Sequence, residues 1–263
     1  MSHLNKFILQ CHDNLISGNS AEINDAKDYL FKRGITPKTI DLHKMGYCPY
    51  STKIPREVIF YGKDLNKIDK GDKGFAYFIA GRIIVPIYSE FNHLVGLATR
   101  KPSTEPGNSW WNISKPFHKS EHLFLLDKAR KSVFKNNKIY LVEGYIDAII
   151  LMQEGLDNVV GLMGINLSPR QIGLIARYCN NICLCLDVDL NNAGQKAQGK
   201  SIYYLKKFDF HESISVVDGL PVKVDPDDFV IKNGIAELLK LERKMTESET
   251  LKIYKEVAAT LNR

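Results

Sequence analysis

Acidic residues follow several apolar runs in the carboxyl-terminal half of the sequence. Glu143 comes directly after YLV, Asp187 comes directly after LCL, and Asp189 follows two positions later. Asp225 and Asp227 belong to the segment VDPDD. Because residues two positions apart in an extended chain point to the same side, Asp187 and Asp189 can face one crevice. This spacing is typical of carboxylates that act as a group.

Carboxylates gathered in one crevice repel each other unless cations neutralise them. Oxygen ligands without thiolate or imidazole favour Mg²⁺ or Mn²⁺. Two such ions, roughly 3.5–4 Å apart, activate an attacking hydroxyl and stabilise a leaving oxygen in phosphoryl transfer. That chemistry depends on acids, metal ions and phosphate-binding cations more than on a protein nucleophile.

Other interpretations of these acids remain open on the residues alone. A single D-x-D is common in surface loops, and the Asp-Pro-Asp segment is also typical of a turn with a helix cap. A calcium loop counted from Asp187 is excluded, because position 6 is Asn192 rather than Gly and position 12 is Gln198 rather than Glu. The common placement of the acids, at one edge of a single predicted sheet, favours the metal site.

Strand and helix patterns alternate from residue 137 onward. Short apolar runs predict strands at 138–142, 158–163, 181–186 and 213–217, with helices over 145–154, 168–178 and 193–208 between them. This order predicts parallel βαβ units in an α/β fold. In such sheets ligands bind at the carboxyl ends of the strands, where the acids fall.

The amino-terminal half has a different pattern. Capping residues predict helices at 20–31 and from 36 onward. Two strands, at 82–88 and 94–100, flank a turn at 89–93, while 49–73 and 101–120 are predicted to be irregular. Residues 234–263 are expected to form one or two amphipathic helices that pack on the sheet or reach a partner. We therefore expect three parts: 1–136, 137–233 and a helical tail at 234–263.

Charge is unevenly distributed over the 263 residues. Residues 1–136 hold 21 Lys and Arg against 13 Asp and Glu, a net charge of +8, and the remainder hold 15 against 17, a net charge of −2. A basic half suggests a polyanionic partner, with a solvated basic surface as the alternative. The five cysteines contain no C-x-x-C pair, which excludes a zinc ribbon and fits a reducing cytoplasm. We expect neither export nor a membrane span, because the longest apolar run has only five residues, 148–152.

Longer segments carry a family resemblance. LVEGYIDAIILMQEGLDNVVGLMGINLSPRQI, LDVDLNNAG and VDPDDFV together resemble the Toprim domain of DnaG-type primases, type IA and II topoisomerases and some nucleases. Upstream, YLFKRGITPKTIDLHKMGYCPY, GRIIVPIYSEFNHLVGLATR and FHKSEHLFLLDKAR resemble, in order, the amino-terminal subdomain of the DnaG-type primase catalytic core. The resemblance covers about residues 20–235. It implies a Toprim-type parallel sheet flanked by helices, after a smaller α+β subdomain and before a short helical tail.

The resemblance also implies an activity, which is the synthesis of RNA primers on single-stranded DNA from ribonucleoside triphosphates by two-metal nucleotidyl transfer. It implies Mg²⁺ or Mn²⁺, as two or more ions, and no zinc. Glu143 would bridge metal and substrate, and Asp147 would position or tune the cluster. The family's metal ligands match Asp187, Asp189, Asp225 and Asp227.

Three basic residues match family positions that contact template or nucleotide phosphates: Arg33, Arg100 and Lys119. We also expect Arg82 and Lys101 to bind nucleotide or DNA. Trp110 and Trp111 could stack on bases, although we favour the interpretation that they anchor their loop to the core.

The sequence departs from the family pattern at three places. Residues 190–192 lengthen the loop after the second Asp of the D-x-D, Ser109 replaces a family lysine, and Ile165 replaces a threonine. None of these changes removes a carboxylate, so we expect the metal site to be retained. The loop insertion lies beside the proposed ligands.

The sequence contains no zinc ribbon and resembles either a reduced phage-like primase or an excised catalytic core. Implied partners beyond template and nucleotides are a replicative helicase and a separate zinc-binding or single-strand-binding protein. The expected location is the cytoplasm, or the host cytoplasm for a phage protein. The alternatives are a Toprim-family nuclease, which would share the acids, and an inactive module that binds single-stranded DNA or a helicase. A topoisomerase is disfavoured, because it needs a nucleophilic tyrosine on a further domain and a subunit large enough to gate a strand.

Overall fold

The computed structural model describes residues 3–59, 76, 79–103, 110–112, 117–187, 193–208, 210 and 213–261. The chain forms two compact units. The amino-terminal unit comprises Met1–Tyr88 and His93–His118, and the carboxyl-terminal unit comprises Lys119–Arg263 with Ser89–Asn92. The three-part division expected from the sequence stays a prediction.

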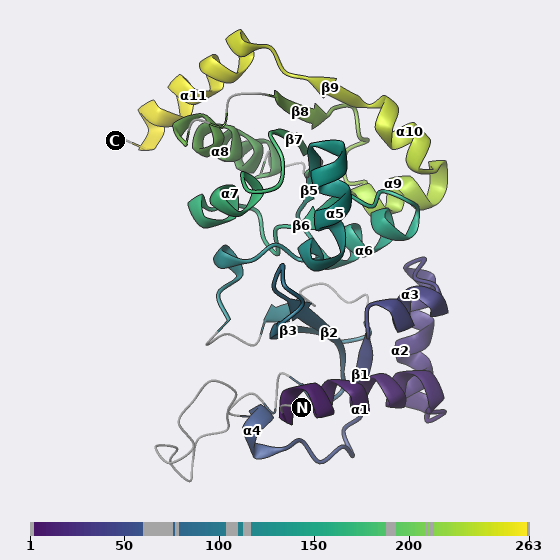
Figure 1. Ribbon diagram of the computed structural model, residues 1–263. Helices are drawn as coiled ribbons and strands as arrows, with labels where there is room; N and C mark the ends of the chain where they lie inside the picture. Colours follow the sequence, from purple (N-terminus) through teal and green to yellow (C-terminus); the bar gives the residue numbers. More distant parts are fainter. Residues whose placement is uncertain are drawn as a thin grey trace. The chain divides into compact units, whose positions relative to one another are not determined.

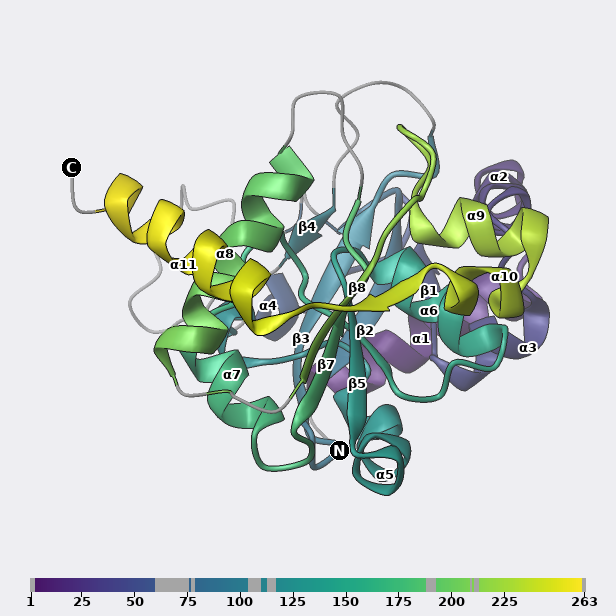
Figure 2. The ribbon, with the colours of Figure 1, turned by 90° about the horizontal axis from the view of Figure 1, so that it is seen from above.

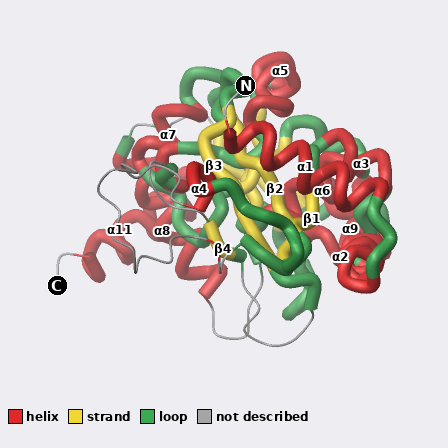
Figure 3. Tube along the Cα trace, turned by 90° about the horizontal axis from the view of Figure 1, so that it is seen from below, coloured by secondary structure: helices red, strands yellow, loops and turns green. Residues whose placement is uncertain are grey.

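The amino-terminal unit contains an antiparallel sheet in the order β1-β2-β3-β4 within its described residues, visible in Figure 3 together with the helices. Its strands are β1 (Gly46–Cys48), β2 (Arg82–Tyr88), β3 (Leu94–Arg100) and β4 (Trp111–Asn112). Its helices are α1 (His3–Ser17), α2 (Ala21–Lys32), α3 (Pro37–Leu42) and α4 (Arg56–Ile59).

Helix α1 packs on β1 through an apolar face that the sequence analysis did not single out. Leu4, Phe7, Cys11 and Leu15 recur at three- and four-residue spacing, and all four are buried. The helix backbone comes so close to β1 that a Cβ atom at Gly46 would lie 2.6 Å from the carbonyl carbon of Cys11. A glycine is therefore required at this contact.

Most predicted elements of this unit are confirmed. Helix α3 begins at Pro37, and the Thr36 side chain caps it by accepting a hydrogen bond from the Thr39 amide at 3.2 Å. Strands β2 and β3 have the predicted bounds. Residues 49–73 were predicted to be irregular, but they contain α4. Residues 101–120 were predicted to be a loop, but they contain β4 and the start of the 3₁₀ helix η3 (Lys119–Glu121). Residues 60–75, 104–109 and 113–116 lie outside the described residues.

The carboxyl-terminal unit is built on one sheet, whose order within the described residues is β6-β5-β7-β8-β9. The first four strands are parallel, and β9 is antiparallel to β8. Its strands are β5 (Lys138–Val142), β6 (Val159–Gly161), β7 (Asn181–Leu184), β8 (Ser213–Val217) and β9 (Glu242–Lys244).

Helices cover both faces of this sheet. Figures 1 and 2 show α7, α8 and α11 on one side and α6, α9 and α10 on the other. The helices are α5 (Leu126–Asn136), α6 (Tyr145–Gln153), α7 (Pro169–Ile175), α8 (Ala193–Lys207), α9 (Pro226–Asn233), α10 (Ile235–Lys240) and α11 (Glu247–Leu261). The parallel α/β fold predicted from the sequence is confirmed.

Burial explains why these strands read as continuous apolar runs. Ile182, Cys183 and Leu184 of β7 are each at most 1% exposed, because helices cover both faces of the strand. Strands β6 and β7 are shorter than predicted. Strand β6 ends before Met163, whose φ of 60° cannot continue a strand.

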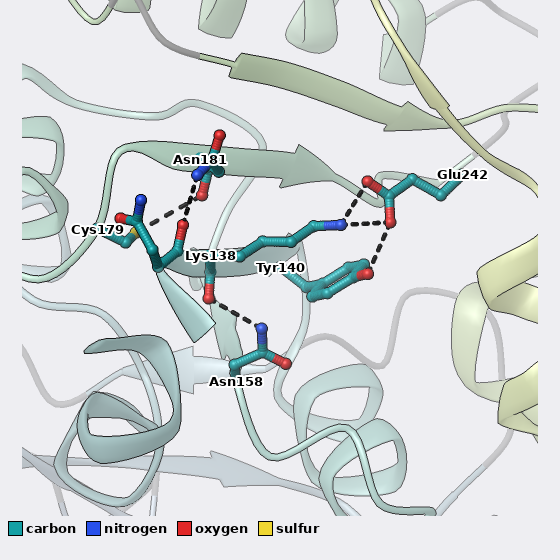
Figure 4. Close-up of polar contacts among 7 residues, drawn as sticks. Lys138, Tyr140, Asn158, Cys179, Asn181 and Glu242 are labelled. Carbon is teal, nitrogen blue, oxygen red and sulfur yellow. Dashed lines mark hydrogen bonds and ion pairs between the residues drawn. The ribbon is translucent and has the colours of Figure 1, made fainter. Parts of the chain in front are cut away.

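The tail contains a strand that the sequence analysis missed. Helices α10 and α11 were expected, but β9 between them reads ERK and carries no apolar signal. Its Glu242 accepts hydrogen bonds from Lys138 Nζ at 2.5 and 2.6 Å and from the Tyr140 hydroxyl at 2.7 Å (Figure 4). This polar cluster ties the tail to β5. None of the described helices is long and apolar enough to cross a membrane.

Candidate active site

Two of the predicted acids meet at the carboxyl edge of the parallel sheet. Strands β5 and β7 are neighbours, so the residues that follow them lie side by side. Glu143 follows β5 directly, and its Oε1 atom accepts a hydrogen bond from the backbone amide of Asp187 at 3.3 Å. Residues 188–192, with Asp189 and the loop insertion, lie outside the described residues.

Asp147 extends this acidic group from the first turn of α6. Its side chain is buried, with the residue only 8% exposed. Burial first, and then the negative charges of Asp227, Asp187 and Asp225, raise the pKa of Asp147 well above its ordinary value. Its Oδ1 atom has no hydrogen-bond partner among the described residues. A buried acid in these surroundings either keeps its proton or requires a nearby cation.

Gly144 allows this carboxylate to turn back toward the start of its own helix. A Cβ atom at position 144 would lie 2.4 Å from Asp147 Oδ2. The Glu-Gly step after β5 therefore has a steric reason, because the glycine leaves space for the acid one turn later.

A third group of acids opens helix α9. Asp225 is the N-cap residue, Pro226 follows it, and Asp227 and Asp228 occupy the first turn. One carboxylate oxygen from each of the three aspartates lies within 4.8 Å of the others. Asp227 is fully buried, whereas Asp228 is exposed. We did not single out Asp228 from the sequence, although it belongs to the same acidic run.

The donor chemistry of these residues fits a hard divalent ion. The charges of Asp187, Asp225 and Asp227 all act on Asp147, so the three acidic segments form one electrostatic group. The nearby thiol of Cys185 is fully buried, and burial raises its pKa well above the ordinary value, so it stays protonated. Carboxylate oxygens are the ligands that Mg²⁺ and Mn²⁺ prefer.

Lys119 lies beside this edge because α7 holds it there. Ser168 and Gln171 form a capping box at the start of α7. The buried Gln171 amide also donates to the carbonyl oxygens of Lys119 at 3.2 Å and His122 at 2.8 Å. Lys119 Nζ would be 3.1 Å from a Cβ atom at Gly164. The 3₁₀ turn and the loop after β6 are therefore adjacent.

The other predicted basic residues belong to the amino-terminal unit. Arg100 lies at the end of β3, with its guanidinium carbon 5.8 Å from the ring centre of Tyr29 and 5.9 Å from that of Trp110. Arg82 is only 4% exposed and donates from Nε to Thr99 Oγ1 at 3.0 Å. This burial argues against direct contact between Arg82 and a nucleic acid.

The remaining predictions in this unit have mixed outcomes. Arg33 is the C-cap residue of α2, and Lys101 is an exposed residue directly after β3. Trp111 is 46% exposed in β4 and so does not anchor the loop in the core, whereas Trp110 is half-buried beside Arg100. Ser109 lies outside the described residues.

Comparisons with known proteins agree with this architecture. Residues 12–130 match the family model "DNA primase catalytic core, N-terminal domain", and residues 140–230 match "Toprim-like". The DNA primase of Rickettsia prowazekii is 34% identical over 236 residues, which cover 85% of this chain and 39% of that protein. The chain thus spans about 39% of the length of the curated relatives that it matches first.

Solved structures share the fold. A DNA primase domain from Pseudomonas aeruginosa superimposes with a TM-score of 0.75 at 22% identity, covering 92% of this chain and 78% of that one. A DnaG primase catalytic domain bound to single-stranded DNA superimposes with a TM-score of 0.68 at 22% identity, covering 91% and 81%.

Proposed function

This chain belongs to the family of DnaG-type DNA primase catalytic cores, and from that premise we propose that it synthesises short RNA primers on single-stranded DNA. The observation that carries the proposal is the acidic group at the edge of the parallel sheet. It joins Glu143 and Asp187 by a hydrogen bond and sets a buried Asp147 against the acids of α9. Positively charged Lys119 lies next to the same edge.

The residues at this edge of the sheet have different roles in the proposed nucleotidyl transfer. Bound Mg²⁺ or Mn²⁺ ions would supply activation of the attacking hydroxyl and stabilisation of the leaving oxygen. In this proposal Glu143, Asp187, Asp225 and Asp227 hold two or more ions, together with Asp189. Asp147 positions the cluster, and Lys119 contacts a nucleotide phosphate.

The template is assigned to the amino-terminal unit. Arg33, Arg100 and Lys101 would contact DNA phosphates, which is consistent with the +8 charge of residues 1–136. The exposed Trp111 offers a face for base stacking. Arg82, buried against Thr99, would support this surface by fixing β2 to β3.

The proposal extends to partners and location. The structural similarity to a DnaG primase catalytic domain bound to single-stranded DNA supports the choice of template. We place the reaction in the cytoplasm, with a replicative helicase and a zinc-binding or single-strand-binding protein as further partners.

A primer-synthesis assay tests the proposal. Single-stranded DNA, labelled ribonucleotides and Mg²⁺ or Mn²⁺ should give short labelled oligoribonucleotides. Replacing a metal ligand, in Glu143→Ala or Asp187→Ala, should reduce synthesis by at least about 10²-fold, the size expected for losing transition-state charge stabilisation. Equal synthesis by these variants and the parent protein would contradict the proposal.

The same acids would also suit a Toprim-type nuclease, so the assay needs a second arm. A pre-labelled DNA strand is incubated with metal but without nucleotides. A primase leaves its length unchanged, whereas shortening that depends on Glu143 would assign the site to strand cleavage instead.

A further inference from the structure

A groove of about 630 Å³ runs between α8 and α11, which lie side by side in Figures 1 and 2. Its apolar lining comes from Ile202 on α8 and from Ile253 and Val257 on α11. Leu261, at the end of α11, borders the groove and is 49% exposed. All of these residues belong to the carboxyl-terminal unit, so the groove is a property of that unit alone.

Direct contacts between the two helices fix the shape of this groove. The rings of Tyr203 on α8 and Tyr254 on α11 are stacked, with their centres 5.1 Å apart and an angle of 18° between their planes. A Cβ atom at Gly199 would lie 3.6 Å from Val257 Cγ2 and 3.7 Å from Ile253 Cγ2, which are ordinary van der Waals distances. Because the helices already touch, they cannot close the groove by moving together.

Charged side chains of opposite sign border the groove. Lys196 and Lys200 come from α8, and Glu256 comes from α11. All three are exposed, and none forms an ion pair with a residue that the structure describes. A twofold axis along the groove would turn the cationic border of one copy against the anionic border of another. The surface is therefore complementary in charge to a copy of itself, whereas a partner with one sign of charge would oppose one of the two borders.

We propose that this groove is the contact surface of a homodimer, in which two copies pack α8 and α11 together about a twofold axis along the groove. Lys200 of one copy then faces Glu256 of the partner subunit, and the same contact is repeated on the other side of the axis. The exposed Leu261 of each copy is removed from water, which adds a favourable apolar contribution. The inference is independent of the proposed reaction, because none of these residues belongs to the acidic site.

Sedimentation equilibrium of the full chain measures the dimer and its charge contacts together. We expect the parent protein to show a monomer–dimer equilibrium that depends on protein concentration. Glu256→Lys and Lys200→Glu should each weaken the homodimer about tenfold, because each brings like charges together at two symmetric positions. An equal mixture of the two variants should recover the affinity of the parent, since every such contact in the mixed dimer again joins opposite charges.

The chain offers a matched control on α11. Lys255 is exposed and adjacent to Glu256 in the sequence, but it does not border the groove. Lys255→Glu changes the net charge by the same amount as Lys200→Glu and should leave the affinity of the dimer unchanged. Thermal unfolding of each variant checks that these exposed substitutions leave the fold intact.

Three results would each overturn the proposal. A parent protein that stays monomeric at every concentration would leave the groove to a different protein or to solvent. A dimer that is equally stable in the parent, Glu256→Lys and Lys200→Glu would have to form through another surface. Equal losses in Lys255→Glu and Lys200→Glu, or a mixture of the two reversed variants that does not recover, would show that net charge and not the groove contact controls association.

Discussion

At the scale of one residue, Asp147 shows why the acids at this edge of the sheet destabilise the folded protein when no cation is bound. Its carboxyl group is buried beside three other aspartates, so ionisation brings like charges together in a region of low dielectric. Gly144 preserves this arrangement by leaving the space that a Cβ atom would fill. Any cation bound among these acids should therefore stabilise the fold as well as serve the reaction.

The raised pKa of Asp147 predicts that the free energy of unfolding falls as pH rises. Because the folded pKa is raised, the folded protein binds the proton more tightly than the unfolded chain. The resulting stability is fully present below the unfolded pKa, about 3.9, and is lost as pH rises through the folded pKa. In EDTA, urea unfolding should thus give a lower free energy of unfolding at pH 8 than at pH 5.5. Asp147→Asn, which stays neutral, should reduce that difference, and an unchanged difference would contradict this explanation.

Part of this acidic site could be predicted from the sequence. The order of strands and acids was sufficient to expect Glu143 near Asp187, since the ends of neighbouring parallel strands meet. Asp228 could not be selected in the same way, because it is the last of several acids in a row. Only the three-dimensional structure distinguishes it, by its proximity to Asp225 and Asp227.

At the scale of elements, polar contacts hold the tail on the sheet, and no hydrophobic pattern in the sequence predicts them. Burial alone would raise the pKa of Glu242. Hydrogen bonds from Lys138, Tyr140 and Ser215 outweigh this effect and hold the pKa below its ordinary value. The charged strand β9 is therefore stable at the edge of an otherwise apolar sheet because its acid is satisfied by partners on β5 and β8. This explains why the sequence predicted the helices of the tail but not its strand.

Removing this acid should loosen the tail. Glu242→Gln should lower the free energy of unfolding by about 2 kcal/mol, as expected for hydrogen bonds to a partly buried charged group. Hydrogen exchange should become faster at the β9 amides. Glu237→Gln is the matched control, because Glu237 pairs with Lys240 in the same segment but both side chains are exposed. Equal effects of the two substitutions would show that the cluster does not hold β9.

The same acid predicts a loss of stability at low pH. Because the folded pKa of Glu242 is lowered, its contribution is present above the unfolded value of about 4.3 and is lost as pH falls through the folded value. The difference in unfolding free energy between the parent and Glu242→Gln should therefore shrink below about pH 4. A difference that is constant from pH 7 to pH 3 would exclude the ionised acid as its source.

The turn that carries Lys119 depends on α7. Gln171 is 1% exposed and donates to the carbonyl oxygens of Lys119 and His122. Gln171→Leu leaves those carbonyls without this donor, which should cost about 1–3 kcal/mol of stability. Nucleotide KM should also rise, since Lys119 is displaced. If Gln171→Leu lowers the stability but leaves KM unchanged, Gln171 stabilises the fold without positioning Lys119 for the phosphate.

At the scale of the whole molecule, the chain combines a basic amino-terminal half with an acidic edge in the parallel sheet. The α/β class and the order of strands and helices in the carboxyl-terminal half could be predicted, because each depends on patterns within short segments. The strand β9 needed tertiary context, whereas the apolar face of α1 was present in the sequence as a helical spacing that we did not single out. Relatives span a longer chain, of which this sequence covers about 39%.

Salt dependence tests the role proposed for the basic half. The logarithm of the affinity for single-stranded DNA should fall linearly with the logarithm of salt concentration, by about 0.7 for each phosphate contact. Lys101→Gln should lower the slope by about that amount. Lys135→Gln, an exposed lysine on α5 outside the proposed set, should leave it unchanged. Identical slopes for all three proteins would remove Lys101 from the DNA-binding surface.

The most direct test of the central claim is anomalous diffraction from crystals soaked in Mn²⁺. The account predicts at least one manganese ion, and two under saturating conditions, among Glu143, Asp187 and the acids of α9. The crystals should lose this signal when Asp187→Asn replaces the parent. Manganese bound only elsewhere, or an unchanged signal in the variant, would contradict a metal-dependent site at this edge of the sheet.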